Sequence, residues 1–317
     1  MTQPTQPTLP ALPTRPTPSA TAAAAAAADA ASIQALIDHR YDGSGLTLGA
    51  ERGSTIAYRQ YYATYRGDGL SISGRINIPR GAGPFPAVVL AHGYVDPAEY
   101  TNGATMLRER DYLARQGYVT LHIDYRNHAQ SSDDPANDAA LRHGYAIDAI
   151  NAALALKAYP AVDPSRVALI GRSMGGGVVY DALVAKPGVF RAAVAYAPVS
   201  SDSVDTFDKW VRRDSSRSGA AAAVINRLGT PEAEPAAWAA TSARGYFGRI
   251  TEPLLIHHGT RDEDCPLSWS RDSVAALKAA GKSVELQLYE GGRHTLTSPQ
   301  WDTSIRRTEA FLAQHLA

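Results

Sequence analysis

The 317-residue sequence has almost no cysteine, no net charge and no long hydrophobic stretch. Cys265 is the only cysteine, which excludes a disulfide within the chain and a metal site made of several cysteines. Basic and acidic residues number 31 each, so charge gives no reason to expect nucleic acid or an anionic membrane surface as a partner. No apolar run approaches the roughly 20 residues that cross a bilayer, and the sequence predicts no transmembrane segment.

The N-terminal segment differs in composition from the rest of the chain. It is rich in Thr, Pro, Gln and Ala, which predicts an extended, polyproline-like and disordered tail over residues 1–31. Ile33, Leu36 and Ile37 follow helical spacing, so we expect a helix that begins within the alanine run at 22–28. Such tails often separate an export signal or lipid anchor from an enzyme, so a secreted or cell-envelope location is one expectation. The alternative is a tail without function.

Strand and helix patterns alternate through the remainder. Two alternating segments rich in Tyr and Ile, 55–64 and 70–78, flank a Gly-containing loop and predict an antiparallel hairpin. Further strands are expected at 87–91, 119–124, 167–170, 192–195, 254–257 and 284–289, and helices at 105–116, 138–159, 175–186, 268–280 and 302–316. This order predicts an α/β fold, with a mostly parallel twisted sheet and helices on both faces.

Residues 200–249 interrupt the alternation, because they are rich in Arg, Ser, Trp, Pro and Ala and contain no clear strand. Open α/β sheets bind ligands at the carboxyl ends of their strands. We therefore expect residues 200–249 to form a small helical insertion over the active site, within one domain that covers residues 32–317.

The string Gly171-Arg172-Ser173-Met174-Gly175 lies between a predicted strand and a predicted helix. In a nucleophile elbow, G-x-S-x-G places the serine on a strained strand-to-helix turn with its hydroxyl exposed. The string alone is weak evidence, and a Gly-rich helix start with an N-capping serine is the alternative. Its position between strand and helix favours Ser173 as a nucleophile.

A serine nucleophile needs a base, and the sequence has nine histidines. His294 lies in a Gly-rich loop directly after the last predicted strand, and loops at strand carboxyl ends converge on the elbow. We expect His294 to be the general base, the alternative being a histidine on a surface loop. His257 and His258 end a strand, where one of them is expected to support the backbone.

The third member must be an acid that fixes the tautomer of the imidazole. One loop after a predicted strand contains three acids, Asp262, Glu263 and Asp264. They precede His294, which gives the chain order Ser, acid, His that is expected when a triad lies on the loops of an α/β sheet. Asp262 is the preferred acid because it comes first after the turn, but spacing does not exclude Asp264. An oxyanion also needs two backbone donors, for which we expect the amides of Met174 and Tyr94, the latter following a Gly turn.

Taken together, these motifs resemble the α/β-hydrolase superfamily over about residues 58–316. The resemblance is closest to the branch of dienelactone-hydrolase-like esterases and prolyl-oligopeptidase catalytic domains, and it implies the α/β-hydrolase fold. It rests on Ala91–Tyr94, Gly171–Gly176, His258–Pro266 and Gly292–His294.

Residues 124–131 also resemble the D-x-R-G-x-G-x-S loop of the superfamily. Asn127 and Ala129 stand where that loop has glycines. The geometry of this loop therefore stays open.

The resemblance implies a serine hydrolase, since related dehalogenases and epoxide hydrolases use aspartate in place of Ser173. Peptidases of this branch usually carry a β-propeller before the hydrolase domain, and only the hairpin and tail precede it here. We therefore expect hydrolysis of small or medium carboxylic esters through an acyl-enzyme, with a peptidase or amidase as the alternative. A non-catalytic binding protein is a remote third, because all three triad members are present.

This chemistry requires no metal and no organic cofactor, and the expected partner is a small-molecule ester. The oligomeric state stays open. Five side chains are expected to contact the substrate, although the aromatic ones among them could equally pack in the core: Tyr94, Arg172, Trp210, Trp238 and Trp269.

Overall fold

The computed structural model describes residues 29–317. Most of the tail predicted over residues 1–31, and the alanine run in which a helix was expected to begin, lie outside the described residues. The helix indicated by Ile33, Leu36 and Ile37 is present as α2 (Ile33–Asp38), but it begins after the turn at residues 29–32 and not within the alanine run as expected. Ser32 ends that turn and caps α2, because its hydroxyl accepts a hydrogen bond from the amide of Ala35.

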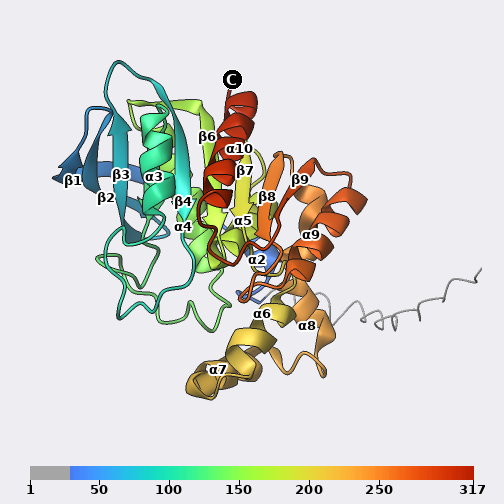
Figure 1. Ribbon diagram of the computed structural model, residues 1–317. Coiled ribbons are helices and arrows are strands. Elements are labelled where there is room, and N and C mark those ends of the chain that lie inside the picture. The colour runs from blue at the N-terminus through green and yellow to red at the C-terminus, as the bar shows by residue number, and fades with distance from the viewer. Residues whose placement is uncertain (1–28) are drawn as a thin grey trace, which may run out of the picture.

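Nine strands form one sheet within residues 29–317, in the order β1-β2-β3-β5-β4-β6-β7-β8-β9 (Figure 1). The strands are β1 (Ser44–Ser54), β2 (Tyr58–Gly67), β3 (Leu70–Pro79), β4 (Phe85–Ala91), β5 (Val119–Ile123), β6 (Val162–Arg172), β7 (Ala193–Tyr196), β8 (Leu254–Gly259) and β9 (Val284–Tyr289). β1, β2, β3 and β5 pair antiparallel, and β5, β4 and β6 to β9 pair parallel. The predicted fold, mostly parallel with an N-terminal antiparallel hairpin, is confirmed.

Helices cover both faces of the sheet (Figure 1). Alternate residues of β4 point to opposite faces, as the pleat requires. Val88 and Leu90 pack in the layer that holds α3 (Leu107–Arg115) and α10 (Gln300–His315). Val89 packs in the opposite layer, with the helices α4 (Gly144–Lys157), α5 (Met174–Ala185) and α9 (Leu267–Ala279).

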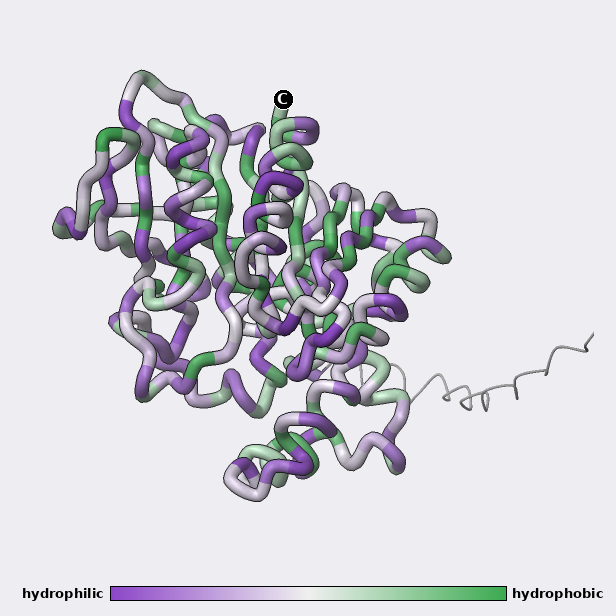
Figure 2. The backbone as a smooth tube through the Cα atoms, in the orientation of Figure 1, coloured by the Kyte–Doolittle hydropathy of each residue, from purple (hydrophilic) through white to green (hydrophobic). Residues whose placement is uncertain are grey.

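The middle of the sheet is its most hydrophobic part, as Figure 2 shows. Every residue of β5 and β7 is buried, which is the pattern of parallel strands covered on two sides. β1, in contrast, is exposed along nearly its whole length and forms one edge of the sheet. β6 and β8, the strands that lead to the predicted elbow and acid loop, flank β7 in this buried part of the sheet.

Residues 200–249 begin directly after β7 and form short helices at one end of the sheet (Figure 1). These are α6 (Ser203–Phe207), a π-helical turn (Asp208–Arg212), a 3₁₀ turn (Ser215–Arg217), α7 (Ser218–Leu228), α8 (Pro235–Ala240) and a second 3₁₀ segment (Ala243–Arg249). Phe207, Val224, Leu228 and Trp238 form a separate small core there, which Ala31 joins from the N-terminal segment. The insertion thus has its own hydrophobic centre.

Two other elements differ from what the sequence analysis expected. β1 was not predicted, and the helix predicted over 138–159 begins only at Gly144. Residues 138–143 instead form turns in which Leu141 and Arg142 have positive φ angles of 53° and 64°. Within residues 29–317, no helix combines the length and the apolar character needed to cross a membrane.

Candidate active site

Ser173 lies at the turn between β6 and α5, with φ 56° and ψ −119°. A non-glycine residue in this region is strained, and such strain persists where the surrounding structure enforces it. Glycines enforce it here: a Cβ on Gly171 would lie 2.0 Å from the Gly175 carbonyl oxygen, and one on Gly175 would lie 2.0 Å from that of Ala91. The backbone therefore folds back too closely for any side chain at position 171 or 175.

His294 pairs with Asp262 in the loops that follow β9 and β8. Nδ1 of His294 lies 3.0 Å from each carboxylate oxygen of Asp262, whose side chain is fully buried. The amides of Asp264 and Cys265 donate to one of these oxygens, at 2.9 and 2.8 Å. Nε2 of His258 lies 3.3 Å from the other.

These donors determine the charge state of the acid. Burial alone would raise the pKa of Asp262. The hydrogen bonds from His258, His294 and the Cys265 amide outweigh burial and hold the pKa of this carboxyl well below its usual value. Asp262 is therefore an anion at neutral pH, and Nδ1 of His294 carries the proton that points at it.

The two neighbouring acids take other positions. Asp264 is largely exposed, and its carboxylate lies 4.0 Å from Nε2 of His294, the ring nitrogen opposite the Asp262 contact. Glu263 accepts hydrogen bonds from the His294 amide, at 3.3 Å, and from the Arg293 side chain, at 3.0 Å. The geometry thus pairs the imidazole with Asp262, and Glu263 fixes the loop that carries it.

Gly93 brings the backbone of the loop after β4 next to Ser173. A Cβ built on Gly93 would lie 3.2 Å from the Ser173 Cβ and 3.7 Å from its hydroxyl oxygen. Nδ1 of His92 lies 2.6 Å from the Gly93 carbonyl oxygen and donates to it. Because the C=O and N–H of a trans peptide point in opposite directions, this contact also sets the direction of the Tyr94 N–H. Met174 starts α5, where N–H groups have no partner within the helix.

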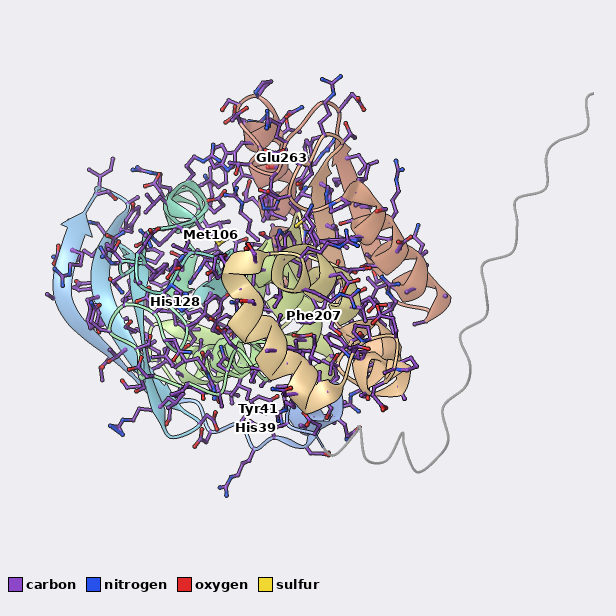
Figure 3. The ribbon with its side chains drawn as sticks, turned by 90° about the horizontal axis from the view of Figure 1, so that it is seen from below. His39, Tyr41, Met106, His128, Phe207 and Glu263 are labelled. Atoms are coloured by element: carbon purple, nitrogen blue, oxygen red, sulfur yellow. The ribbon has the colours of Figure 1, made fainter. Side chains whose placement is uncertain are left out.

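The side chains of Ser173 and His294 line one cavity of about 530 Å³. Figure 3 views the molecule from the side on which the insertion lies. It labels Phe207 of the insertion and Met106 of the loop before α3, which both line the cavity, and Glu263 of the acid loop. Its mainly apolar wall also includes the following residues: Val95, Leu141, Val178, Val199 and Val224.

Three of the five side chains expected to contact substrate, Tyr94, Arg172 and Trp210, line this cavity. Trp269 does not line it, but packs edge-on against Trp210 with ring centroids 5.3 Å apart. Trp238 is a correction: it is fully buried in the core of the insertion, 4.6 Å from the Phe207 ring, and its indole N–H donates to the Gly229 carbonyl. An indole that satisfies its N–H in this way packs as core.

Tyr94 is held between two guanidinium groups. Arg142, from the turns before α4, lies 4.8 Å from the centre of the Tyr94 ring, and Arg217, from the insertion, lies 4.5 Å from it. Each arginine also pairs with an acid of its own segment, Asp138 at 2.8 Å and Asp214 at 3.6 Å. This clasp ties the insertion to the loop that follows β4.

The 124–131 loop lies behind the His92 loop. Asn127 and Ala129, which replace glycines of the superfamily loop, have φ angles of 67° and 51°. The left-handed geometry that glycine favours is thus retained without it. The Asp124 carboxylate accepts hydrogen bonds from several groups, among them the Tyr100 hydroxyl at 2.8 Å, and the Tyr100 ring stacks on His92.

Within the described residues, no three His, Cys, Asp or Glu side chains are grouped so that they could hold a metal ion. Ser173, the His294–Asp262 pair and the backbone amides beside them are groups of the kind that serine hydrolases use.

Residues 105–317 match the prolyl oligopeptidase family. The chain belongs to this family. It is 27% identical over 252 residues to the uncharacterized peptidase YuxL of Bacillus subtilis, which covers 74% of this chain and 35% of YuxL. It therefore spans only about a third of that relative's length. A second B. subtilis relative, the uncharacterized peptidase YtmA, is 24% identical over 240 residues, or 74% of this chain and 86% of YtmA.

The solved structures that resemble this prolyl oligopeptidase family member include esterases and peptidases. An acetyl xylan esterase from Paenibacillus sp. R4 has a TM-score of 0.67 at 20% identity, covering 88% of this chain and 92% of that one. A puromycin-hydrolyzing peptidase of Mycobacterium tuberculosis has a TM-score of 0.65 at 22% identity, covering 83% and 40%. Identities this low show the α/β-hydrolase fold alone.

Two supports of the site in this family member were not assigned from sequence. His258 lies against Asp262 on one side, while its other ring nitrogen, Nδ1, lies 2.7 Å from the Ser270 hydroxyl. His92 orients the peptide before Tyr94. The available signals were the position of His258 at a strand end and the His-Gly pair after β4, but neither specifies which atom the ring will contact.

Proposed function

We propose that this chain hydrolyses small or medium carboxylic esters through an acyl-enzyme on Ser173, with His294 as base and Asp262 as the acid. The observation that carries the proposal is that the strained Ser173 lines the same cavity as His294, whose Nδ1 pairs with the buried carboxylate of Asp262. The shared cavity supports a reaction in which a bound carbonyl meets nucleophile and base together.

In this mechanism His294 accepts the proton of the Ser173 hydroxyl as its oxygen attacks the ester carbonyl. The amides of Met174 and Tyr94 donate to the oxyanion of the tetrahedral intermediate. His294 then returns the proton to the departing alcohol. Water activated by the same imidazole releases the acid and restores Ser173, while the Asp262 anion stabilises the imidazolium at each step.

The contribution of the insertion to the cavity wall favours a small ester over a long peptide. The insertion supplies part of the wall, and Arg217 on the insertion stacks on Tyr94 beside Ser173. An extended peptide would need an open groove on both sides of the nucleophile.

A peptidase or amidase is the second candidate, because the chain belongs to a family of oligopeptidases and resembles peptidases in fold. A panel of nitrophenyl esters with acyl chains of rising length, assayed beside aminoacyl and prolyl anilides, decides between the two. We expect turnover of short and medium esters and little cleavage of the anilides. Efficient cleavage of a prolyl anilide would establish the peptidase instead.

A further inference from the structure

The cavity continues from Ser173 along one face of α5. Met174, Gly177, Val178 and Asp181 are spaced i, i+3, i+4 and i+7, so they share one face of the helix, and all four line the cavity. At a rise of 1.5 Å per residue, the Cα of Asp181 lies about 12 Å from that of Ser173. The far end of the cavity is therefore marked by a carboxylate.

Asp181 has an unusual environment for a carboxylate. Its side chain is mostly buried, and its one ion-pair contact among residues 29–317 is Nδ1 of His143, at 3.0 Å. No Lys or Arg nitrogen of the described chain lies within 4.0 Å of it. A carboxylate removed from water without a cation is costly, so a bound cation would stabilise this end of the cavity.

His143 completes the pair and also lines the cavity. Its side chain is only 6% exposed, and its Nε2 is buried with no hydrogen-bond partner in the described structure. Nδ1 of His143 is the donor to the carboxylate, which leaves the other lone pairs of Asp181 to a donor in the cavity. A group with several N–H bonds can therefore bind Asp181 beside His143.

Three arginines line the cavity, and none of them pairs with Asp181. Arg172 donates a hydrogen bond to the Thr295 hydroxyl. Arg142 is paired with Asp138 at 2.8 Å, Arg217 is paired with Asp214, and both stack on the Tyr94 ring. The Asp181 carboxylate therefore remains available to a bound cation.

We infer that the Asp181–His143 pair is a subsite for a primary ammonium group at the far end of the substrate, with an apolar chain between it and the scissile carbonyl. This inference rests on the proposed ester hydrolysis and names its substrate class, an ω-amino acyl ester. An extended chain advances about 1.2 Å per bond, so the six bonds from the carbonyl carbon to the ammonium of a 6-aminohexanoyl group span about 7 Å. A hydrogen bond of about 2.9 Å to the carboxylate completes the reach.

The test compares kcat/KM for nitrophenyl esters of hexanoic, 6-hydroxyhexanoic and 6-aminohexanoic acid, each corrected for spontaneous hydrolysis, with nitrophenyl acetate as a substrate too short to reach Asp181. We expect the amino ester to exceed the hexanoate by about ten- to a hundredfold, as a charge-assisted hydrogen bond in a buried site implies. Asp181→Asn should abolish this preference and leave acetate turnover within about threefold. Asp272→Asn, which removes an exposed carboxylate on α9, is the matched control and should keep the preference.

Two results would overturn the inference: equal kcat/KM for the amino ester and the hexanoate, or a preference that survives Asp181→Asn. An equal gain for the hydroxy ester would show a neutral donor subsite and would also reject the ammonium. Should Asp181→Asn fold poorly, His143→Gln serves as the second variant, with a loss of at least fivefold in the preference expected.

Failure of the proposed function is distinguished by a binding measurement. Hexylamine should bind the Ser173→Ala variant in calorimetry, and Asp181→Asn in that background should weaken it at least tenfold. If no ester is hydrolysed but hexylamine binds in this way, the ammonium subsite stands and ester hydrolysis is wrong. If esters are hydrolysed and hexylamine does not bind, the subsite is wrong and the proposed function stands.

Discussion

Nδ1 of His294 lies 3.0 Å from both carboxylate oxygens of Asp262. A carboxylate in this position holds the imidazole in the tautomer with its proton on Nδ1. Nε2 is then free to accept a proton, which is the state that a general base requires. The pair therefore determines both the orientation and the protonation of His294.

Asp262→Asn should keep the fold and reduce kcat by about 10⁴-fold, the effect of removing the acid of a trypsin-type triad. An amide places an N–H against Nδ1 and favours the wrong tautomer. Asp264→Asn is the matched control, since its exposed carboxylate lies 4.0 Å from the other ring nitrogen, and it should cost less than tenfold. Steady-state assays of both variants check this, and a reversed order would make Asp264 the acid.

Ser173→Ala should lower kcat by about 10⁶-fold, as loss of the serine does in subtilisin, and remove labelling by a fluorophosphonate probe. The probe reacts only with an activated hydroxyl, so gel detection of the label reports on this side chain. Mass spectrometry of the labelled wild type should place the modification on the peptide that contains Ser173. A label of normal intensity on the variant would locate the nucleophile elsewhere.

Buried neutral histidines should make the fold sensitive to acid. Burial lowers the pKa of His92 to about 4 and that of His257 to about 3, although hydrogen bonds to backbone carbonyls act against this at His92. An unfolded histidine binds a proton below about pH 6.5. These side chains therefore contribute stability that is complete above pH 6.5 and is lost as the pH falls through about 4 and then 3.

Urea unfolding between about pH 7.5 and pH 4.5 measures this loss as the slope of the unfolding free energy against pH. His257→Asn should flatten the slope, because one fewer proton is taken up on unfolding, even though the contacts to Tyr289 and Thr308 change at every pH. An unchanged slope in the variant would show that His257 is protonated in the folded state.

Arg217→Ala should loosen the clasp on Tyr94 and widen the entrance to the cavity. We expect kcat/KM for nitrophenyl acetate to fall about three- to tenfold, since a cation–π contact at a partly exposed site contributes on the order of 1 kcal/mol. Bulky acyl groups should lose less or gain. Arg213→Ala, in the same segment but exposed, is the control and should change neither value.

The sequence predicted the sheet, the helix layers and the place of Ser173 because these follow from periodicity and from turn chemistry. β1 was not predicted because it is an edge strand exposed on both faces. Since neither face is buried, its sequence shows no alternation of apolar and polar residues. The helix expected from Asp138 begins later because Leu141 and Arg142 adopt positive φ, which neither residue type signals.

Side-chain partners were harder to predict than elements. Trp238 and Trp210 lie in the same insertion, yet one packs in its core and the other lines the cavity. Composition cannot separate them, because the choice depends on how short helices pack in three dimensions. The same holds for His258, whose support of Asp262 follows from a loop that folds back onto its own strand.

The insertion has consequences for how such an enzyme can diversify. Phe207, Val224 and Trp238 give it a core that is distinct from the two layers on the sheet, while Phe207 and Val224 also line the cavity. Substitutions that reshape this wall change the packing of the insertion. They should not destabilise the sheet whose loops carry Ser173 and His294. A combinatorial library confined to the insertion should therefore change selectivity at nearly constant expression, which makes this segment the natural target for evolving the enzyme toward new substrates.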